Sequence, residues 1–317
     1  MKKMLRLVGV AITLSLFWGV LTSTNIVAQN IYLNASPLRS KTTTYWVACG
    51  GDKVRIIDVN KSDSSHAEII WEWNQNNTKS EVPSNYVSLF KTMDECKPIE
   101  NNTKILACSS AGGAMIIDIN GHKCEYYCRA PQAHSIEMLP NNRIVVAEST
   151  TDLGNALEVF DITKKTSSAI IRDSMYSAHG VVWYEETQRL YAIGKNLFRI
   201  YKLTDWDTNK PSLTLETELK LPVSGAHDLT RIDNHRLLIS CTAGVYYYDI
   251  NTKTISKFDP LVDYTDLKSV NYNYKTGQIV YTKPEESWWT YHLSSLNPTF
   301  GIGMSDVNVY KVRVFQE

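Results

Sequence analysis

The chain has 317 residues, of which 33 are basic and 33 acidic, so its formal net charge at pH 7 is zero. Hydrophobic residues make up 43% and charged residues only 21%, which excludes a disordered protein and a nucleic-acid binder that relies on a global positive field. Aromatic residues reach 10%, with 18 Tyr and 8 Trp, and this bias favours strands over helices.

The first 29 residues have the pattern of a secretory signal peptide. Lys2, Lys3 and Arg6 precede a largely apolar run over residues 7–21, and a polar segment follows. The run is shorter than the roughly 20 residues that a membrane-spanning helix needs. We therefore expect a leader at 1–29, a domain at 30–317, and a mature protein that is periplasmic or secreted with no membrane span.

The six cysteines are too few for a disulfide scaffold in a chain of this length. Cys124 and Cys128 have only a loose resemblance to metal-ligand spacing, and on one strand they would lie about 13 Å apart, too far to bond to each other. We expect the cysteines to be small buried hydrophobes with at most a single bridge.

A short pattern recurs along the chain: two apolar or aromatic residues, then Asp or Lys, then an apolar residue. Six copies lie at residues 56–60, 116–120, 159–163, 200–204, 247–251 and 309–313. The aspartates have two interpretations, a bond to the backbone of the following turn, which we favour, or a role in binding.

A second pattern, an apolar strand that ends in small or polar residues, lies upstream of most copies. It occurs at residues 47–50, 106–109, 146–149, 191–194, 239–242 and 280–283. With a further short strand before most of these and a fourth strand after the aspartates, each unit has four strands. The sequence thus predicts an all-β fold, a six-bladed β-propeller. A β-sandwich is the alternative, but it would not explain two patterns repeated in phase.

Three of the seven histidines occupy the same phase of this repeat, each after an alanine and at the start of the first strand of its unit. Continuing the phase in both directions adds an aspartate and a lysine, giving Asp94, His134, His179, His227 and Lys268. The first strand of a propeller blade lines the central channel, so we expect these five side chains around one mouth of it.

Imidazoles in phase are not required by the fold, so they suggest a site. Three neutral imidazoles that converge are good ligands for a divalent metal such as Zn²⁺, Mn²⁺ or Fe²⁺, and His134, His179 and His227 are the predicted ligands. The alternative is that each Ala-His pair bonds the neighbouring blade and was copied with the repeat.

The segment from Lys283 to His292 is the second candidate site. It contains Trp288 and Trp289, which would supply a stacking wall for sugar rings, and His292 is a possible general base or fourth ligand. Lys283 or Lys268 would meet a substrate carboxylate or transfer a proton. The alternative is a hydrophobic plug over the channel.

With these residues in view, the chain resembles an uncharacterised family of exported Bacteroidota six-bladed propellers, a domain of unknown function. The most specific matches are Cys-Gly-Gly-Asp at 49–52 and the stretch 288–298. The axial histidines are more distantly similar to those of oligogalacturonate lyases, and that resemblance implies a metal that neutralises a uronate carboxylate. A third resemblance, to six-bladed lactonases, would imply calcium held by Asp, Asn and Glu, which histidines do not fit.

The leading hypothesis is a metal-dependent lyase or hydrolase that acts on acidic oligosaccharides at the channel mouth. Its candidate catalytic residues are Lys268, His292 and Lys283, and its candidate substrate-binding residues are Asp94, Glu148, Trp288 and Trp289. The alternative is a non-catalytic propeller that binds a glycan or a protein on the same rim, and a third hypothesis is a purely structural role. The sequence contains no run of basic residues, so we do not expect a nucleic-acid partner.

Overall fold

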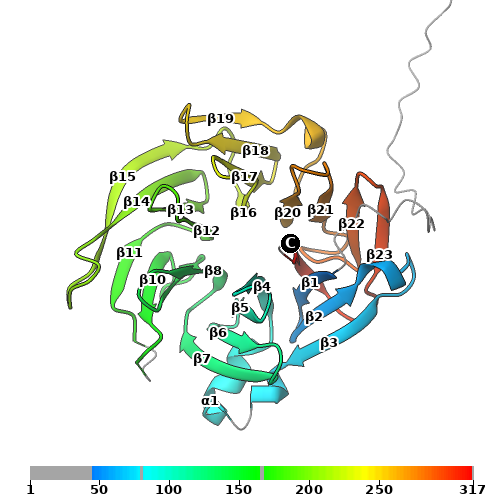
Figure 1. Cartoon of the computed structure of the whole chain (residues 1–317), viewed down its shortest axis with the longest axis horizontal. Helices are drawn as coiled ribbons and strands as arrows, with labels where there is room; N and C mark the ends of the chain where they lie inside the picture. The colour runs from blue at the N-terminus through cyan, green and yellow to red at the C-terminus, as the bar shows by residue number, and fades with distance from the viewer. Residues whose placement is uncertain (1–44, 79–80, 165–167, 316–317) are drawn as a thin grey trace, which may run out of the picture. The chain divides into compact units, whose positions relative to one another are not determined.

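The structure is a computed structural model that describes residues 45–78, 81–164 and 168–315. The predicted leader at 1–29 lies outside these residues. The described part contains six four-stranded antiparallel sheets. Figure 1 views them along the ring axis, with β4, β8, β12, β16 and β20 nearest the centre. The predicted six-bladed β-propeller is confirmed.

Each sheet runs from an innermost strand at the channel to an outermost strand at the perimeter. In that order the first two sheets are β24 (Val309–Val314), β1 (Tyr45–Gly50), β2 (Lys53–Asp58), β3 (Glu68–Asn74), and β4 (Met93–Ile99), β5 (Lys104–Ser109), β6 (Gly113–Asp118), β7 (Lys123–Arg129). The next two are β8 (Ala133–Leu139), β9 (Arg143–Glu148), β10 (Ala156–Asp161), β11 (Ile171–Ser174), and β12 (Ala178–Tyr184), β13 (Arg189–Gly194), β14 (Leu197–Thr204), β15 (Ser212–Lys220). The last two are β16 (Ala226–Arg231), β17 (Arg236–Cys241), β18 (Gly244–Asp249), β19 (Thr254–Lys257), and β20 (Ser269–Tyr272), β21 (Ile279–Thr282), β22 (His292–Leu296), β23 (Phe300–Gly303).

Helices are short and lie in the connections. They are α1 (Ser84–Val87), η2 (Val59–Lys61), η3 (Gln75–Thr78), η4 (Ser88–Phe90) and η5 (Asp259–Leu261). Within the described ranges, none has the length and apolar character of a membrane-crossing helix.

The repeated aspartates end the third strand of their sheets and bond the following turn. Asp58 accepts from the Asn60 amide at 3.1 Å, and Asp249 accepts from the Asn251 amide at 2.9 Å. Asp118 and Asp161 accept in the same way from amides two or three residues later. The turn interpretation of the aspartate pattern is therefore confirmed.

The sixth copy of that pattern, at residues 309–313, occupies a different strand position from the one its repeat predicts. These residues form β24, which pairs with β1 as the innermost strand of the first sheet, whereas the third strand of the last sheet is β22. The physical reason is ring closure: a propeller leaves no free inner edge when its last strand joins its first sheet. The sequence of this innermost strand, with its buried lysine and arginine, resembles the pattern of the third strand closely enough to be confused with it.

The core lies between the sheets rather than at the centre of the ring. Six clusters of buried apolar side chains each combine residues of two neighbouring sheets. In the closing cluster, Trp46 is fully buried and stacks on Phe300 of the preceding sheet, with ring centroids 5.5 Å apart. Burying one such side chain contributes about 1.5–3 kcal/mol, so every sheet is stabilised by both neighbours.

The cysteines belong to this core. All six are free thiols, and all but the half-buried Cys124 are buried. The expectation of small buried hydrophobes is confirmed, and no disulfide bridge forms.

The two ends of the ring differ in their loops. The innermost strands begin at one end, which we call the rim, and the longer connections reach it, among them residues 75–92, 258–268 and 283–291. The opposite face carries short turns such as residues 140–142 and 250–253, and longer connections such as residues 59–67 and 205–211 there do not exceed nine residues. The rim is therefore the elaborated face of the propeller.

Candidate functional site

A bulge at the start of the innermost strands sets the position of the candidate site. In β8, Ala133 pairs with Glu148 and Ser135 pairs with Ala147, so His134 between them is the extra residue. The same shift occurs around Asp94, His179 and His227, and around Tyr310 in β24. Bulges of this kind leave a residue unpaired and re-aim its side chain.

These positions define a set of six residues, which we call the rim ring. Lys268 is the sixth member. It occupies the equivalent position in the last sheet, directly before β20 begins, where its amide donates to the Thr282 carbonyl. The members of the rim ring are Asp94, His134, His179, His227, Lys268 and Tyr310.

The three predicted imidazoles lie next to one another in the rim ring. The ring centroids of His134 and His179 are 4.4 Å apart, and those of His179 and His227 are 5.9 Å apart. Tyr310 stands on the other side of His134, with centroids 6.0 Å apart. The phase of the histidines in the sequence thus corresponds to adjacency in space.

Two of these imidazoles are fixed by backbone carbonyl groups. The Nδ1 atom of His134 lies 2.8 Å from the Gln132 carbonyl, and that of His179 lies 2.9 Å from the Ser177 carbonyl. A carbonyl only accepts, so both Nδ1 atoms carry a proton. Burial, followed by the neighbouring His134, lowers the pKa of His179 well below its ordinary value, so His179 is neutral.

The third imidazole is fixed by a lysine. Lys268 Nζ lies 3.0 Å from His227 Nε2 and 2.7 Å from a carboxylate oxygen of Asp266. The ammonium donates, so His227 accepts at Nε2 and is protonated at Nδ1, which is buried without a hydrogen-bond partner in the described chain. Burial and then Lys268 lower the pKa of His227 to about 4.

Asp94 and Tyr310 complete the rim ring on the side of the first two sheets. Asp94 is buried and accepts from the Ser110 amide at 2.5 Å. Burial raises the pKa of Asp94, although the nearby His134 acts in the opposite direction. Burial also raises the pKa of Tyr310 well above its ordinary value, so this residue keeps its hydroxyl proton.

The three-histidine metal centre predicted from the sequence pattern finds no support in the described residues. No group of three or more His, Cys, Asp or Glu side chains in the described parts of the chain is arranged to hold a metal ion. The Lys268 contact explains part of this, because His227 Nε2 faces an ammonium group instead of a shared centre. His227 would have to give up this contact to serve as the third ligand.

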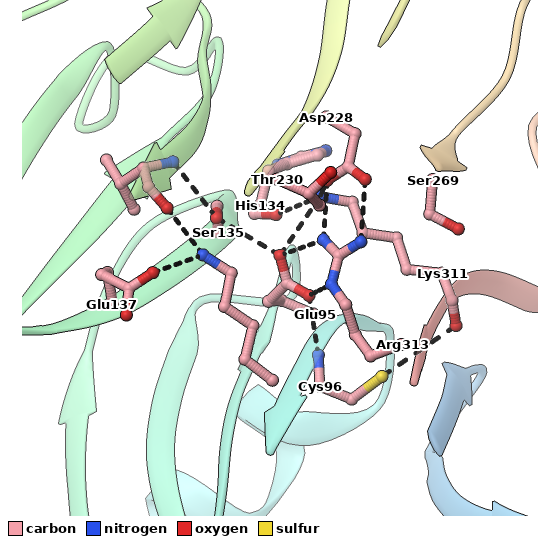
Figure 2. A network of polar contacts seen from close by, with 12 residues as sticks. Glu95, Cys96, His134, Ser135, Glu137, Asp228, Thr230, Ser269, Lys311 and Arg313 are labelled. Atoms are coloured by element: carbon pink, nitrogen blue, oxygen red, sulfur yellow. Dashed lines mark hydrogen bonds and ion pairs between the residues drawn. The ribbon is translucent and has the colours of Figure 1, made fainter. Parts of the chain in front are cut away.

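A buried network of four charged side chains lies next to the rim-ring residue His134 (Figure 2). The Arg313 guanidinium donates to Glu95 at 2.8 and 2.7 Å and to Asp228 at 2.8 and 2.6 Å. Lys311 Nζ lies 3.4 Å from Glu95, 3.2 Å from Asp228 and 3.0 Å from the His134 carbonyl. We call Glu95, Asp228, Lys311 and Arg313 the channel network.

The channel network joins three innermost strands across the channel. Its members come from β4, β16 and β24, and all four are buried. Burial alone would raise the pKa of Glu95, but Arg313 and then Lys311 lower it to about 2. Two carboxylates thus neutralise two cations in this network.

The segment 283–291 stands at the rim beside Tyr310. Thr290 and Val309 exchange backbone hydrogen bonds of 3.0 Å, which anchors the segment to the start of β24. Trp288 is 58% exposed, whereas Trp289 is half-buried and packs edge-on against it. A hydrophobic plug would bury Trp288, so its exposure favours a binding surface.

The remaining predicted residues lie outside the rim ring. His292 is fixed within its own loop, where Nδ1 lies 2.7 Å from a carboxylate oxygen of Glu285. Lys283 is exposed at the start of the same loop. Glu148 is buried at the end of β9, 3.3 Å from Arg172, and burial followed by Glu158 raises its pKa to about 9.

Comparison with protein-family models gave a match over residues 11–317 to a family of unknown function, DUF6528. The chain belongs to this family. A search of curated proteins found no match. Membership in DUF6528 covers the whole propeller and assigns no chemistry, so the function has to be argued from the site itself.

Several site residues of this DUF6528 chain are not predicted by the sequence patterns above, although signals for them exist. Tyr310 comes 42 residues after Lys268, within the range of the other steps between rim-ring members, but its surroundings match the pattern of an outer strand. Glu95 and Asp228 directly follow the rim-ring residues Asp94 and His227. An acid repeated at that next position is visible in the sequence, whereas its two cationic partners depend on placing β24 correctly.

Proposed function

We propose that the protein is an exported glycan-binding propeller whose rim ring takes a carboxylate-bearing sugar. The observation that carries this proposal is a ring of hydrogen-bonding groups, among them the neutral His179 and His227 and the phenol of Tyr310, beside a single ring ammonium, that of Lys268. The predicted leader would export the protein. Glycans of this kind are found outside the cytoplasm, so export and the proposed ligand agree.

The rim ring offers what a sugar acid needs. The Nε2 atom of the neutral His179 is free to accept from a hydroxyl group, and the hydroxyl of Tyr310 can donate. Lys268 provides a charged donor for a carboxylate, and such charge-assisted bonds are the stronger ones. These groups are held by backbone carbonyls and by Asp266, so little side-chain entropy is lost on binding.

The geometry favours binding over catalysis. His292, the candidate base, is held by Glu285 in its own loop, and Lys268 already contacts His227 and Asp266. A general base has to reach the proton that it removes, and neither group is placed free above the rim ring.

Titration calorimetry with oligomers of galacturonic, guluronic and mannuronic acid tests the proposal. We expect binding of at least one acidic series, no comparable binding of neutral galactose oligomers, and a loss of at least tenfold in affinity in Lys268→Met. Lys257→Met is the matched control, because Lys257 is exposed on the outermost strand β19. Absence of binding to every acidic series, or equal affinity in Lys268→Met, would overturn the proposal.

A metal-dependent lyase or hydrolase acting on acidic oligosaccharides is the second candidate. It is favoured by the Nδ1 contacts of His134 and His179, because metal-binding histidines commonly donate their other nitrogen to a carbonyl. In this version the three histidines hold the metal and Lys268, Lys283 and His292 serve catalysis. It requires a rise in melting temperature with Mn²⁺, Zn²⁺ or Fe²⁺ that His179→Ala abolishes, together with product formation; protein without either effect would rule it out.

A further inference from the structure

Large apolar side chains are exposed around the rim ring. Tyr176 is 56% exposed, Trp288 58% and Leu153 72%, and all three lie on rim connections. Val262, in the connection before β20, is exposed there as well. Tyr274, at 50%, lies in a turn of the opposite face and provides a natural comparison.

Tyr176 belongs to a segment that is held in place next to His179. The Met175 amide donates to the backbone carbonyl of Asn155 at 2.9 Å. The Ser177 amide donates to the side-chain oxygen of Asn155, also at 2.9 Å. The Ser177 carbonyl in turn holds the His179 imidazole. The exposed Tyr176 ring therefore lies on a segment that hydrogen bonds hold in place, because they join the connection before β12 to the connection before β10.

Trp288 is held on a second, separate support. Glu285 accepts from the Thr290 hydroxyl at 2.5 Å and from the Tyr291 amide at 2.7 Å, and Glu286 accepts from the Tyr291 hydroxyl at 2.6 Å. Together with the Thr290–Val309 backbone pair, these bonds keep the loop in one shape. An exposed indole on such a loop is preorganised for contact.

The two aromatic residues stand on opposite sides of the channel mouth. Around the axis the innermost strands follow the order β24, β4, β8, β12, β16, β20, with contacts between neighbours. β12, which Tyr176 precedes, is three places from β24, to which the Trp288 loop is anchored. In this order the strands β16 with His227 and β20, which follows Lys268, lie between them on one side, and β4 with Asp94 and β8 with His134 lie between them on the other.

We infer that the ligand is an acidic oligosaccharide long enough to span the mouth, with one sugar ring on Trp288, another toward Tyr176 and a carboxylate at Lys268. This inference rests on the proposed function and adds the length of the ligand and the role of Tyr176. A sugar chain alternates hydroxyls with apolar C–H faces, which matches aromatic surfaces separated by polar groups. A protein partner would favour a continuous apolar centre with a polar rim, which is the reverse arrangement.

A length series of the uronic acid oligomers, from one to five units, tests the inference by titration calorimetry on the mature chain. We expect affinity to rise at least tenfold between the monomer and the trimer or tetramer. Tyr176→Ala and Trp288→Ala should each weaken binding of the longer oligomer about tenfold, and more than binding of the monomer. Tyr274→Ala is the matched control and should bind like the wild type, and thermal melting checks that each variant is folded.

The outcomes separate this inference from the proposed function. Binding that depends on Lys268 but does not change with oligomer length, or that is unaffected by Tyr176→Ala, overturns the spanning ligand and leaves the rim-ring proposal intact. No binding of any uronic acid oligomer overturns both.

Discussion

At the scale of single residues, the three rim-ring histidines differ in what fixes them. His134 and His179 are oriented by backbone carbonyls, so replacing a side chain nearby leaves their tautomers unchanged. His227 is oriented by the Lys268 ammonium, and burial, followed by Lys268, lowers its pKa so that it is uncharged at neutral pH. The phase of the histidines is readable from the sequence, but these tautomers are not, because they depend on distances between atoms of different segments.

The titration of His227 follows from this contact. We expect its pKa in the folded protein at about 4, and we expect Lys268→Met to raise it, because a positive charge 3.0 Å away is removed. Since the ordinary value is 6.5, the unfolded chain binds more protons between these values, and stability falls as pH falls through this window. Imidazole NMR resonances measured against pH check the prediction, and titration of wild-type His227 near 6.5 would contradict it.

Glu148 is predicted to act on stability and not on ligand binding. Its pKa of about 9, against an ordinary 4.5, means that the folded state holds a proton that the unfolded state has lost, so its contribution to stability decreases as pH rises between these values. Glu148→Gln keeps the shape of the neutral acid and should raise the melting temperature at pH 8.5 but not at pH 5. Glu218→Gln, at an exposed ion pair with Arg199, is the control and should give no such gain. Destabilisation by Glu148→Gln at pH 8.5 would contradict the account.

At the scale of elements, β24 has two roles. It closes the ring by pairing with β1, and it carries Lys311 and Arg313 into the channel network. The first and last strands of the described chain therefore meet through backbone bonds, and β24 is also tied to β4 and β16 by buried charges. Buried charge pairs of this kind add little when complete but are costly when one partner is missing.

Arg313→Met tests the role of β24. It leaves Glu95 and Asp228 buried with Lys311 alone, and we expect a loss of about 3–5 kcal/mol in the free energy of unfolding, measured by urea denaturation. Arg189→Met is the matched control, since Arg189 pairs with Glu216 at the surface and should cost no more than about 1 kcal/mol. Adding Glu95→Gln to Arg313→Met should recover part of the loss. Equal destabilisation by the two arginine variants would contradict the assigned role of the channel network.

At the scale of the whole molecule, the fold is predictable from the sequence and the site only in part. Two patterns repeated in phase predict six four-stranded units, because each blade must present similar apolar faces to its neighbours. The order of the strands in the closing sheet is not predictable from the pattern, because Tyr310-Lys311 in the innermost strand β24 resembles Tyr201-Lys202 in the third strand β14. Because of this ambiguity, the sequence pattern does not predict that Tyr310 belongs to the rim ring or that Lys311 and Arg313 belong to the channel network.

The same scale explains why the phase of the three histidines is not enough to predict a metal centre. Phase places three imidazoles around one mouth, but it does not say where the neighbouring Lys268 points. Similarly, phase brings Glu148 and His292 to the rim end of their strands, whereas their partners Arg172 and Glu285 hold them in other surroundings. Residues on innermost strands are placed more accurately than residues on loops, because strand register is set by the repeat.

Hydroxyl-radical footprinting of the mature chain, with and without the uronic acid oligomer that binds most tightly, tests the central claim most directly. The account predicts protection of Trp288 and Tyr176 at the rim when the ligand is present, with Tyr274 on the opposite face oxidised to the same extent in both samples. Protection of Tyr274 without protection of Trp288 and Tyr176, or no change at any of the three, would contradict a ligand site at the rim ring.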